Sequence, residues 1–269
     1  MSAHFPTHRM QRAQGTASVS LKSGGRLDRL RQQGSAKAIL PHVPGAPEVV
    51  FLNTSGGLTG GDRLSLSLDL ADGVRATATT QTAERAYRAG EGRARIDVTM
   101  TVGAGGWLDW LPQETILFDG AALERDTRIE LGRDAGCILC EMVVLGRAAM
   151  GETVERLHLT DRRQVLRAGR PVLVDPVRLD DGALGAGAAG LGGARAFASV
   201  AMVGQGAQDA LGPVRAVLDQ PGVRAAASGL DGRLQIRILA QDGWPMRRQI
   251  ARILTVLRQG AALPRVWQI

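Results

Sequence analysis

Residues 64–70 read LSLSLDL, with a leucine at every second position, and this alternation sets the expected fold class. A period of two is typical of a β-strand that has one face in the core and the other in water. Residues 95–102, RIDVTMTV, repeat the pattern with Ile, Val and Met. Both stretches therefore predict half-buried strands.

Shorter strand-like runs continue along the chain, and turn signals that contain Gly and Asp separate many of them. The runs lie at 48–53, 74–80, 127–131, 137–146, 154–160, 171–179 and 233–239. So many short strands at close spacing predict a mostly β architecture of stacked or packed sheets.

Only two segments carry the marks of a helix. In residues 245–260, apolar side chains recur at helical spacing, Pro245 suits the first turn, and Gly260 suits the C-terminal stop. The second segment lies between Gly212 and Gln220. We therefore predict a mostly β (α+β) fold with about two α-helices packed on the sheets.

The expected domain organisation is simple. The first residues are polar and unpatterned, so we predict a disordered tail over residues 1–16 and a single domain over residues 17–269. A Gly/Ala tract at 182–193 resembles a linker but could equally be a loop. A chain of 269 residues can bury a substantial core without disulfide staples.

The charge of the chain points to protein partners. The formal net charge is +7, but only two of the 33 basic residues are lysine, and the arginines are spread along the chain. Aromatic residues make up 3%, too few for a platform on which single-stranded bases would stack. Because arginine is enriched at protein–protein interfaces, we expect such an interface and no nucleic-acid partner.

The cellular location follows from two further features. The sequence has only two cysteines and lacks the apolar run of a secretory signal, which favours a reduced, cytoplasmic protein. It also lacks a stretch of eighteen or more apolar residues, so we expect no contact with a membrane.

The two cysteines, Cys137 and Cys140, stand three residues apart within a predicted strand, so their side chains point to opposite faces. A structural zinc site needs two more ligands at suitable spacing, and none is present. We therefore expect one buried and one partly exposed thiol. Motifs for a catalytic nucleophile or a zinc protease, GxSxG and HExxH, are also absent from the sequence.

Residues 52–65, LNTSGGLTGGDRLS, form a glycine-rich stretch that ends on Asp62 and the start of a strand. A Walker A loop continues with Gly-Lys-Ser/Thr, and a dinucleotide fingerprint opens a helix, so neither motif fits. We interpret the glycines as residues of tight turns that leave the carboxylate of Asp62 reachable.

Carboxylates interrupt or flank several apolar strand runs. They are Asp109, Glu114, Glu141 and Asp175. A buried carboxylate is costly unless it is paired, hydrogen-bonded or in contact with water. Arginine partners, for instance Arg147 or Arg178, would make these groups structural. The alternative is a wet, acid-lined passage that binds a divalent cation weakly, without a closed cage of thiolates and imidazoles.

Six segments, taken together, resemble the urease accessory protein D family. They are LNTSGGLTGGDRL (52–64), TTQTAERAYR (79–88), WLPQETILFDGA (110–121), LGRAAMGE (145–152), GRPVLVDPVRL (169–179) and LPRVWQI (263–269). The resemblance runs from about Leu21 to the C-terminus.

The resemblance implies a non-catalytic scaffold or metallochaperone subunit. Such a subunit binds the urease apoprotein and accessory protein F, and through it the GTPase accessory protein G. Nickel would pass through an internal tunnel to the urease active site, so the resemblance implies transient Ni²⁺ and no tightly bound cofactor. It also implies stacked sheets with helix-like winding and two helices, in agreement with the patterns above.

By position, the resemblance implies a tunnel-associated, transient metal contact at Asp62, Glu141 and Asp175. It also places a second group near the tunnel or an interface: Glu84, Arg85, Tyr87 and Arg88. A hypothesis from another class is a metal-dependent hydrolase that uses Asp62, Glu141 and Asp175 as its metal ligands.

Overall fold

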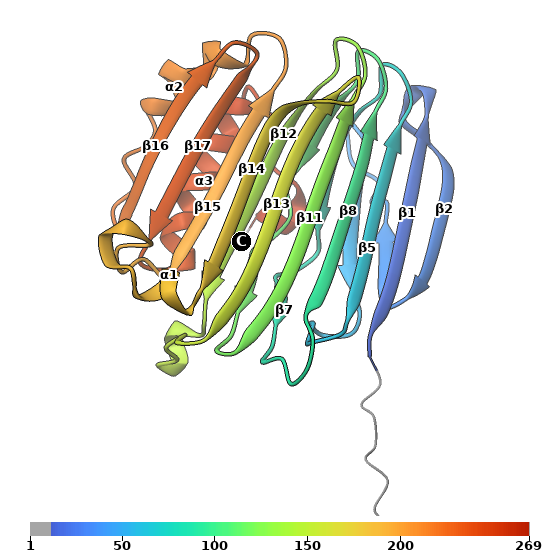
Figure 1. The fold of residues 1–269 in the computed structure, drawn as a ribbon. Coiled ribbons are helices and arrows are strands. Elements are labelled where there is room, and N and C mark those ends of the chain that lie inside the picture. Colours follow the sequence, from blue (N-terminus) through green and yellow to red (C-terminus); the bar gives the residue numbers. More distant parts are fainter. Residues whose placement is uncertain (1–11, 269) are drawn as a thin grey trace, which may run out of the picture.

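The structure, a computed structural model, describes residues 12–268. Its strands form two sheets that lie face to face, and helices cover the outer side of one sheet at the end that is coloured orange and red (Figure 1). The predicted mostly β class is therefore confirmed.

One sheet has seven strands. In spatial order they are β14 (Arg170–Asp180), β13 (Leu157–Arg167), β11 (Ala121–Leu131), β8 (Ala94–Val102), β5 (Arg63–Leu70), β1 (Gln14–Lys22) and β2 (Arg26–Gly34).

The other sheet has ten strands. The main path is β16 (Val223–Leu230), β17 (Arg233–Ala240), β15 (Ala196–Val203), β12 (Gly136–Leu145), β9 (Trp107–Trp110), β6 (Arg75–Thr80), β4 (Glu48–Asn53) and β3 (Ala36–Ile39). Two short strands lie off this path, β7 (Glu84–Ala86) and β10 (Thr115–Leu117). β10 pairs with β12 on one side and with β7 on the other.

The middle of the chain winds between the two sheets. In the seven-stranded sheet β5, β8, β11 and β13 are parallel neighbours, and β6, β9 and β12 are parallel neighbours in the other sheet. In chain order these strands alternate between the sheets, which gives a solenoid-like arrangement.

The hydrophobic core has two parts. The leucines of LSLSLDL and the apolar residues of β8 point into a layer between the sheets, as their alternation predicts. A second cluster lies on the other face of the ten-stranded sheet, where the helix α3 (Gly243–Leu257) packs with Ile250, Ile253 and Leu254. The ten-stranded sheet is therefore covered on both faces at this end.

The described residues contain three α-helices instead of the two predicted. The unpredicted one, α1 (Asp181–Gly185), forms at the start of the Gly/Ala tract because the side chain of Asp180 accepts a hydrogen bond from the N–H of Ala183 and caps it. The helix α2 (Leu211–Arg215) is shorter than expected. No helix among residues 12–268 has the length and apolar character needed to cross a bilayer.

Both thiols are fully buried, so the expectation of a partly exposed one is wrong. Cys137 lies in the layer between the sheets and Cys140 lies in the cluster under α3. Their side chains do point to opposite faces, but each face of the strand is covered. Burial raises the pKa of the Cys137 thiol to about 12, and it raises that of Cys140 as well.

The folded part also begins earlier than expected. β1 starts at Gln14, within the predicted tail of residues 1–16, while residues 1–11 lie outside the described range. β1 is held there by parallel pairing with β5, in which Gln14 lies opposite Arg63. Such a contact between distant segments leaves no local signal.

Candidate functional site

Six charged residues lie between or beside the two sheets and alternate in sign. We call them the charge ladder: Glu141, Arg125, Asp161, Arg163, Asp175 and Arg237.

Arg125 carries the first half of the ladder. Its Nη1 lies 2.7 Å from Oε2 of Glu141 on the facing sheet, and its Nη2 lies 2.7 Å from Oδ2 of Asp161 on the adjacent strand. The other oxygen of Glu141 accepts a hydrogen bond of 3.0 Å from the indole N–H of Trp110. All these side chains are buried, so the pairs are shielded from solvent.

Asp175 carries the second half. Nη1 of Arg163 lies 3.4 Å from Oδ2 of Asp175, and the hydroxyl of Ser199 donates a hydrogen bond of 2.7 Å to the same oxygen. Arg237 contacts the other oxygen, Oδ1. The side chain of Arg237 is 51% exposed whereas that of Asp175 is 2% exposed, so the ladder reaches solvent at Arg237.

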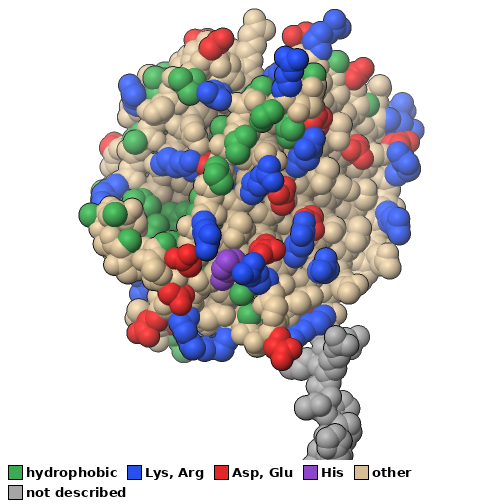
Figure 2. Space-filling view, viewed as in Figure 1, with side chains coloured by type: hydrophobic (Ala, Val, Ile, Leu, Met, Phe, Trp, Pro, Cys, Tyr) green, Lys and Arg blue, Asp and Glu red, His purple; other side chains and the backbone are tan. Residues whose placement is uncertain are grey.

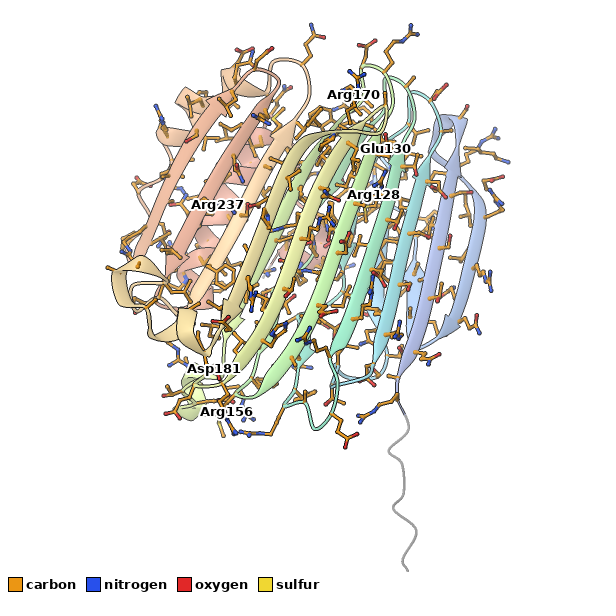
Figure 3. All side chains as sticks on the ribbon, in the orientation of Figure 1. Arg128, Glu130, Arg156, Arg170, Asp181 and Arg237 are labelled. Carbon is orange, nitrogen blue, oxygen red and sulfur yellow. The ribbon has the colours of Figure 1, made fainter. Side chains whose placement is uncertain are left out.

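Strand register brings these residues together. Arg125 lies opposite Asp161, and Arg163 lies opposite Asp175. In the facing sheet, Ser199 lies opposite both Glu141 and Arg237. Because β17 continues the ten-stranded sheet past β14, the last strand of the seven-stranded sheet, Arg237 stands at the margin of the covered layer (Figure 3).

Sequence reasoning missed Arg125, Asp161 and Arg163, although a signal was available. In β11, Arg125 is in phase with the buried Leu123 and Ile129. Asp161 and Arg163 occupy the corresponding inward positions of β13. A charged residue in phase with buried apolar residues indicates a buried ion pair.

Burial shifts the pKa values of the ladder in different directions. It raises the pKa of Glu141, and Arg125 offsets this shift only in part. Burial also acts to raise the pKa of Asp161, but Arg125 and Arg163 outweigh it and lower that pKa. Glu141 is therefore the more easily protonated of the two carboxylates beside Arg125.

The interior carboxylates do have arginine partners, but not those expected. Arg147 pairs instead with Glu152, and Arg178 with Asp180. The other two carboxylates are also paired, at 2.8 Å for Arg258 with Asp109 and 3.3 Å for Arg247 with Glu114.

Asp62 stands apart from the ladder, at the start of β5. Its two carboxylate oxygens accept hydrogen bonds from the N–H groups of Ala13, at 2.7 Å, and Thr59, at 2.8 Å. The side chain is buried, so the expected reachable carboxylate is wrong: both oxygens hold the backbone. The glycines do shape turns, since Gly57 has a φ of +143° and Gly61 a φ of +90°.

The structure does not assemble Asp62, Glu141 and Asp175 into one ligand set. Within residues 12–268, no three His, Cys, Asp or Glu side chains lie in an arrangement that could hold a metal ion. The hydrolase hypothesis requires such a set, and the placement of these three residues does not provide it.

Glu84 lies beside the glycine-rich stretch. Its carboxylate accepts hydrogen bonds of 3.2 and 3.3 Å from the side-chain amide of Asn53. A cavity of about 50 Å³ adjoins it, and Gly56, Gly57 and Leu64 of the glycine-rich stretch help to line it. Burial raises the pKa of Glu84 to about 7, despite the hydrogen bonds from Asn53.

The rest of the Glu84 group lies at the surface. The N–H of Leu58 donates a hydrogen bond of 2.7 Å to the carbonyl of Arg85, and the N–H of Tyr87 donates one of 2.8 Å to the carbonyl of Leu58. These bonds hold the segment that contains Arg85 and Tyr87 against the glycine-rich stretch. The ring of Tyr87 stacks at 5.0 Å on that of Phe118, and the side chain is 43% exposed. Arg88 forms an ion pair of 2.5 Å with Asp119.

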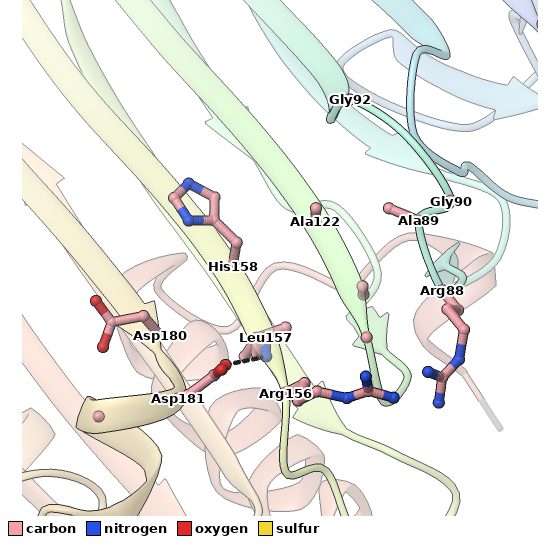
Figure 4. A pocket seen from close by; sticks show the side chains of 13 residues that line it. Arg88, Ala89, Gly90, Gly92, Ala122, Arg156, Leu157, His158, Asp180 and Asp181 are labelled. Carbon is pink, nitrogen blue, oxygen red and sulfur yellow. Dashed lines mark hydrogen bonds between the residues drawn. The ribbon is translucent and has the colours of Figure 1, made fainter.

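Arg88 also borders a surface groove with a volume of about 730 Å³ (Figure 4). Arg156 and His158 line the groove, and Asp181 accepts a hydrogen bond from the N–H of Leu157 there. Arg88 and Arg156 both form ion pairs with Asp119, so this carboxylate partly neutralises their positive charges. On the face of the seven-stranded sheet, basic and acidic side chains are interspersed, without a single-sign track for a nucleic-acid backbone (Figure 2).

The two facing sheets and the charged layer between them define a solenoid-like β protein with an ionic interior. Residues 12–268 match the family model described as UreD urease accessory protein. The chain belongs to this family.

Curated relatives carry the same name. The chain is 64% identical over 269 residues to the urease accessory protein UreD of Cereibacter sphaeroides, an alignment that covers 98% of each chain. It is 56% identical to that of Paracoccus denitrificans, covering 97% of this chain and 94% of the relative. Identity to the protein of Rhizobium leguminosarum bv. viciae is 42%, covering 97% of each. The general role of the family is in urease maturation.

Proposed function

We propose that this chain is a cytoplasmic, non-catalytic scaffold that binds the urease apoprotein and accessory protein F, and through it accessory protein G. In this proposal Ni²⁺ is cargo that crosses the interior of the chain on its way to urease. The observation that carries the proposal is the match to the UreD urease accessory protein family. The charge ladder adds carboxylates inside a layer that is otherwise rich in apolar side chains, although their arginine partners also give them a structural role.

The ladder supports a route for a cation in two ways. Its carboxylates run from Asp175, beside the exposed Arg237, to Glu141 in the buried layer. Carboxylate oxygens suit a hard or borderline divalent ion. In addition, each carboxylate is held by a guanidinium, so an incoming cation must displace a positive charge. That competition keeps binding weak and lets the ion leave again.

Asp62 has a positioning role in this proposal. It fixes the turn at Thr59 through a hydrogen bond, and the same glycine-rich stretch lines the cavity at Glu84. Loss of its carboxylate would release the turn and change the shape of that cavity. We place Glu84 at the route as a contact for the ion, and Arg85, Tyr87 and Arg88 at the adjoining protein interface.

The test is the Asp62→Ala plus Asp175→Ala double variant, assayed with urease and the accessory proteins at limiting nickel. We expect the complex to assemble, as judged by co-elution, and urease activation to fall. A matched control is Asp69→Ala, which removes an exposed carboxylate from the outer face of β5. Normal activation by the double variant would refute both the role of Asp175 in passing nickel and the positioning role of Asp62.

A further inference from the structure

We propose that β2 is a strand-addition site for an extended, acidic segment of a protein partner. β2 forms one edge of the seven-stranded sheet, and among the described residues it pairs only with β1. All nine of its residues are exposed. For the identity of the partner, this inference rests on the proposed function.

The backbone of β2 offers an open row of hydrogen-bonding groups. In an antiparallel pair, every second residue of an edge strand points its N–H and C=O away from its neighbour. Within residues 12–268, no backbone group of residues 26–33 bonds to a segment other than β1. The register with β1 shifts between Ser20 and Leu21, where Asp28 has no partner, so the regular part of this row runs from Arg29 to Gly34. Six residues extend for roughly 20 Å, enough to pair with a short partner strand.

Apolar side chains adjoin this row. Leu27 lies opposite Leu21 and Leu30 lies opposite Val19, and both partners are buried in the core. Side chains of directly opposed residues share a face, and the register shift at Asp28 brings Leu27 onto the same face as Leu30, so both leucines point to the core side of the sheet. They are nevertheless 44% and 40% exposed, because the core layer does not extend over them. An edge strand that is protected from partners would carry polar residues there.

The charge of β2 selects the partner. The strand contains Arg26, Arg29 and Arg31 against a single acidic residue, Asp28. Pairing of two β2 edges from two copies of the chain would bring arginines together, and like charges on paired strands are unfavourable. A segment with acidic residues between apolar ones would instead neutralise the arginines and cover the leucines.

β2 is also well separated from the helical end of the molecule. β2 forms the blue edge in Figure 1, whereas α3 and β16 lie at the opposite end. β16 is the corresponding edge strand of the other sheet, and it serves as an internal control because it has eight residues and pairs only with β17 among the described strands.

The test is hydrogen–deuterium exchange of the full chain, alone and mixed with urease apoprotein or with accessory protein F. We expect one of these proteins to slow exchange at least about tenfold in β2, while exchange in β16 stays unchanged. The Arg29→Glu plus Arg31→Glu variant should bind that protein at least about tenfold more weakly. The matched control, Arg162→Glu plus Arg170→Glu, reverses two exposed charges on β13 and β14, the last two strands at the opposite side of the same sheet, and should bind normally.

The outcomes separate this inference from the proposed function. Binding of either protein without slower exchange in β2 would overturn the inference and leave the proposed function standing. If exchange in β2 slows only as the concentration of the chain itself rises, the occupant of β2 is a second copy of the chain and not an acidic partner. That result would also overturn the inference. Absence of binding to both proteins would overturn the proposed function and this inference together.

Discussion

The guanidinium of Arg125, on β11, lies 2.7 Å from the carboxylate of Glu141, on β12, and joins the two facing sheets through the middle of the core. The same guanidinium also holds Asp161. Each of these charges depends on the others for its stability in a layer with little access to water.

Replacement of Arg125 by alanine should therefore destabilise the protein strongly. It leaves Glu141 without a guanidinium partner and Asp161 with Arg163 alone, and removal of one partner from a buried pair costs about 3–5 kcal/mol. The free energy of unfolding in urea measures the loss. Arg128→Ala, which removes an exposed pair with Glu130, is the control and should cost about 1 kcal/mol or less. Equal losses in the two variants would contradict a buried, interdependent ladder.

Stability should fall as the pH rises through the titration of Glu84. The folded-state pKa of Glu84 is about 7, above the unfolded value of about 4.3, so folding favours its protonated form. The wild-type chain therefore loses up to about 3 kcal/mol between pH 4 and pH 8 from this group. In Glu84→Gln this contribution to the pH dependence of the free energy of unfolding should disappear.

Thermal unfolding at pH 4 and pH 8 checks this prediction. The variant and the wild type should be similar at pH 4, and the variant should be the more stable at pH 8. Glu91→Gln, at an exposed loop position, should follow the wild type at both values. If Glu84→Gln loses as much stability as the wild type between pH 4 and pH 8, groups other than Glu84 cause the pH dependence.

Gly57 should tolerate alanine worse than Gly56 does. Both have a positive φ, of +143° and +79° respectively, so both substitutions strain the backbone. A β-carbon at Gly57 would also lie 2.5 Å from the ring of Tyr87 and 2.7 Å from the carbonyl oxygen of Arg85, whereas one at Gly56 meets nothing within 4 Å. The urea midpoints of Gly57→Ala and Gly56→Ala compare the two costs. Equal midpoints would show that the turn relaxes without contact with Tyr87.

The predictability of each strand depended on how many of its faces are buried. β5 and β8 have one buried face, so alternation marks them in the sequence. In β2 both faces are exposed, and in β15 nearly all residues are buried, so neither shows a period of two. The positions of β2 and β15 in the fold are set by the strands with which they pair.

The site was predictable to a similar, limited extent. Glu141 and Asp175 stand out as carboxylates in apolar runs, and the structure places both in the ladder. Their partners come from strands that are distant in sequence: Arg237 is 62 residues from Asp175. Likewise, the Asp62 carboxylate binds Ala13, at a separation of 49 residues. No local pattern encodes such contacts, so sequence reasoning chose Arg147 and Arg178 incorrectly.

The passage of nickel through the ladder is tested by the nickel content of urease after maturation with Asp175→Asn. This variant keeps the shape of the side chain and removes its charge, while the buried Arg163 keeps its second contact, to Asp161 at 3.8 Å, so the complex should assemble as it does with the wild type. We expect the nickel content of urease at limiting nickel to fall at least about tenfold, since a neutral amide is a much poorer ligand for a divalent ion. The Asp69→Asn control should support full loading. Full loading of urease by an assembled Asp175→Asn complex would contradict the proposed route.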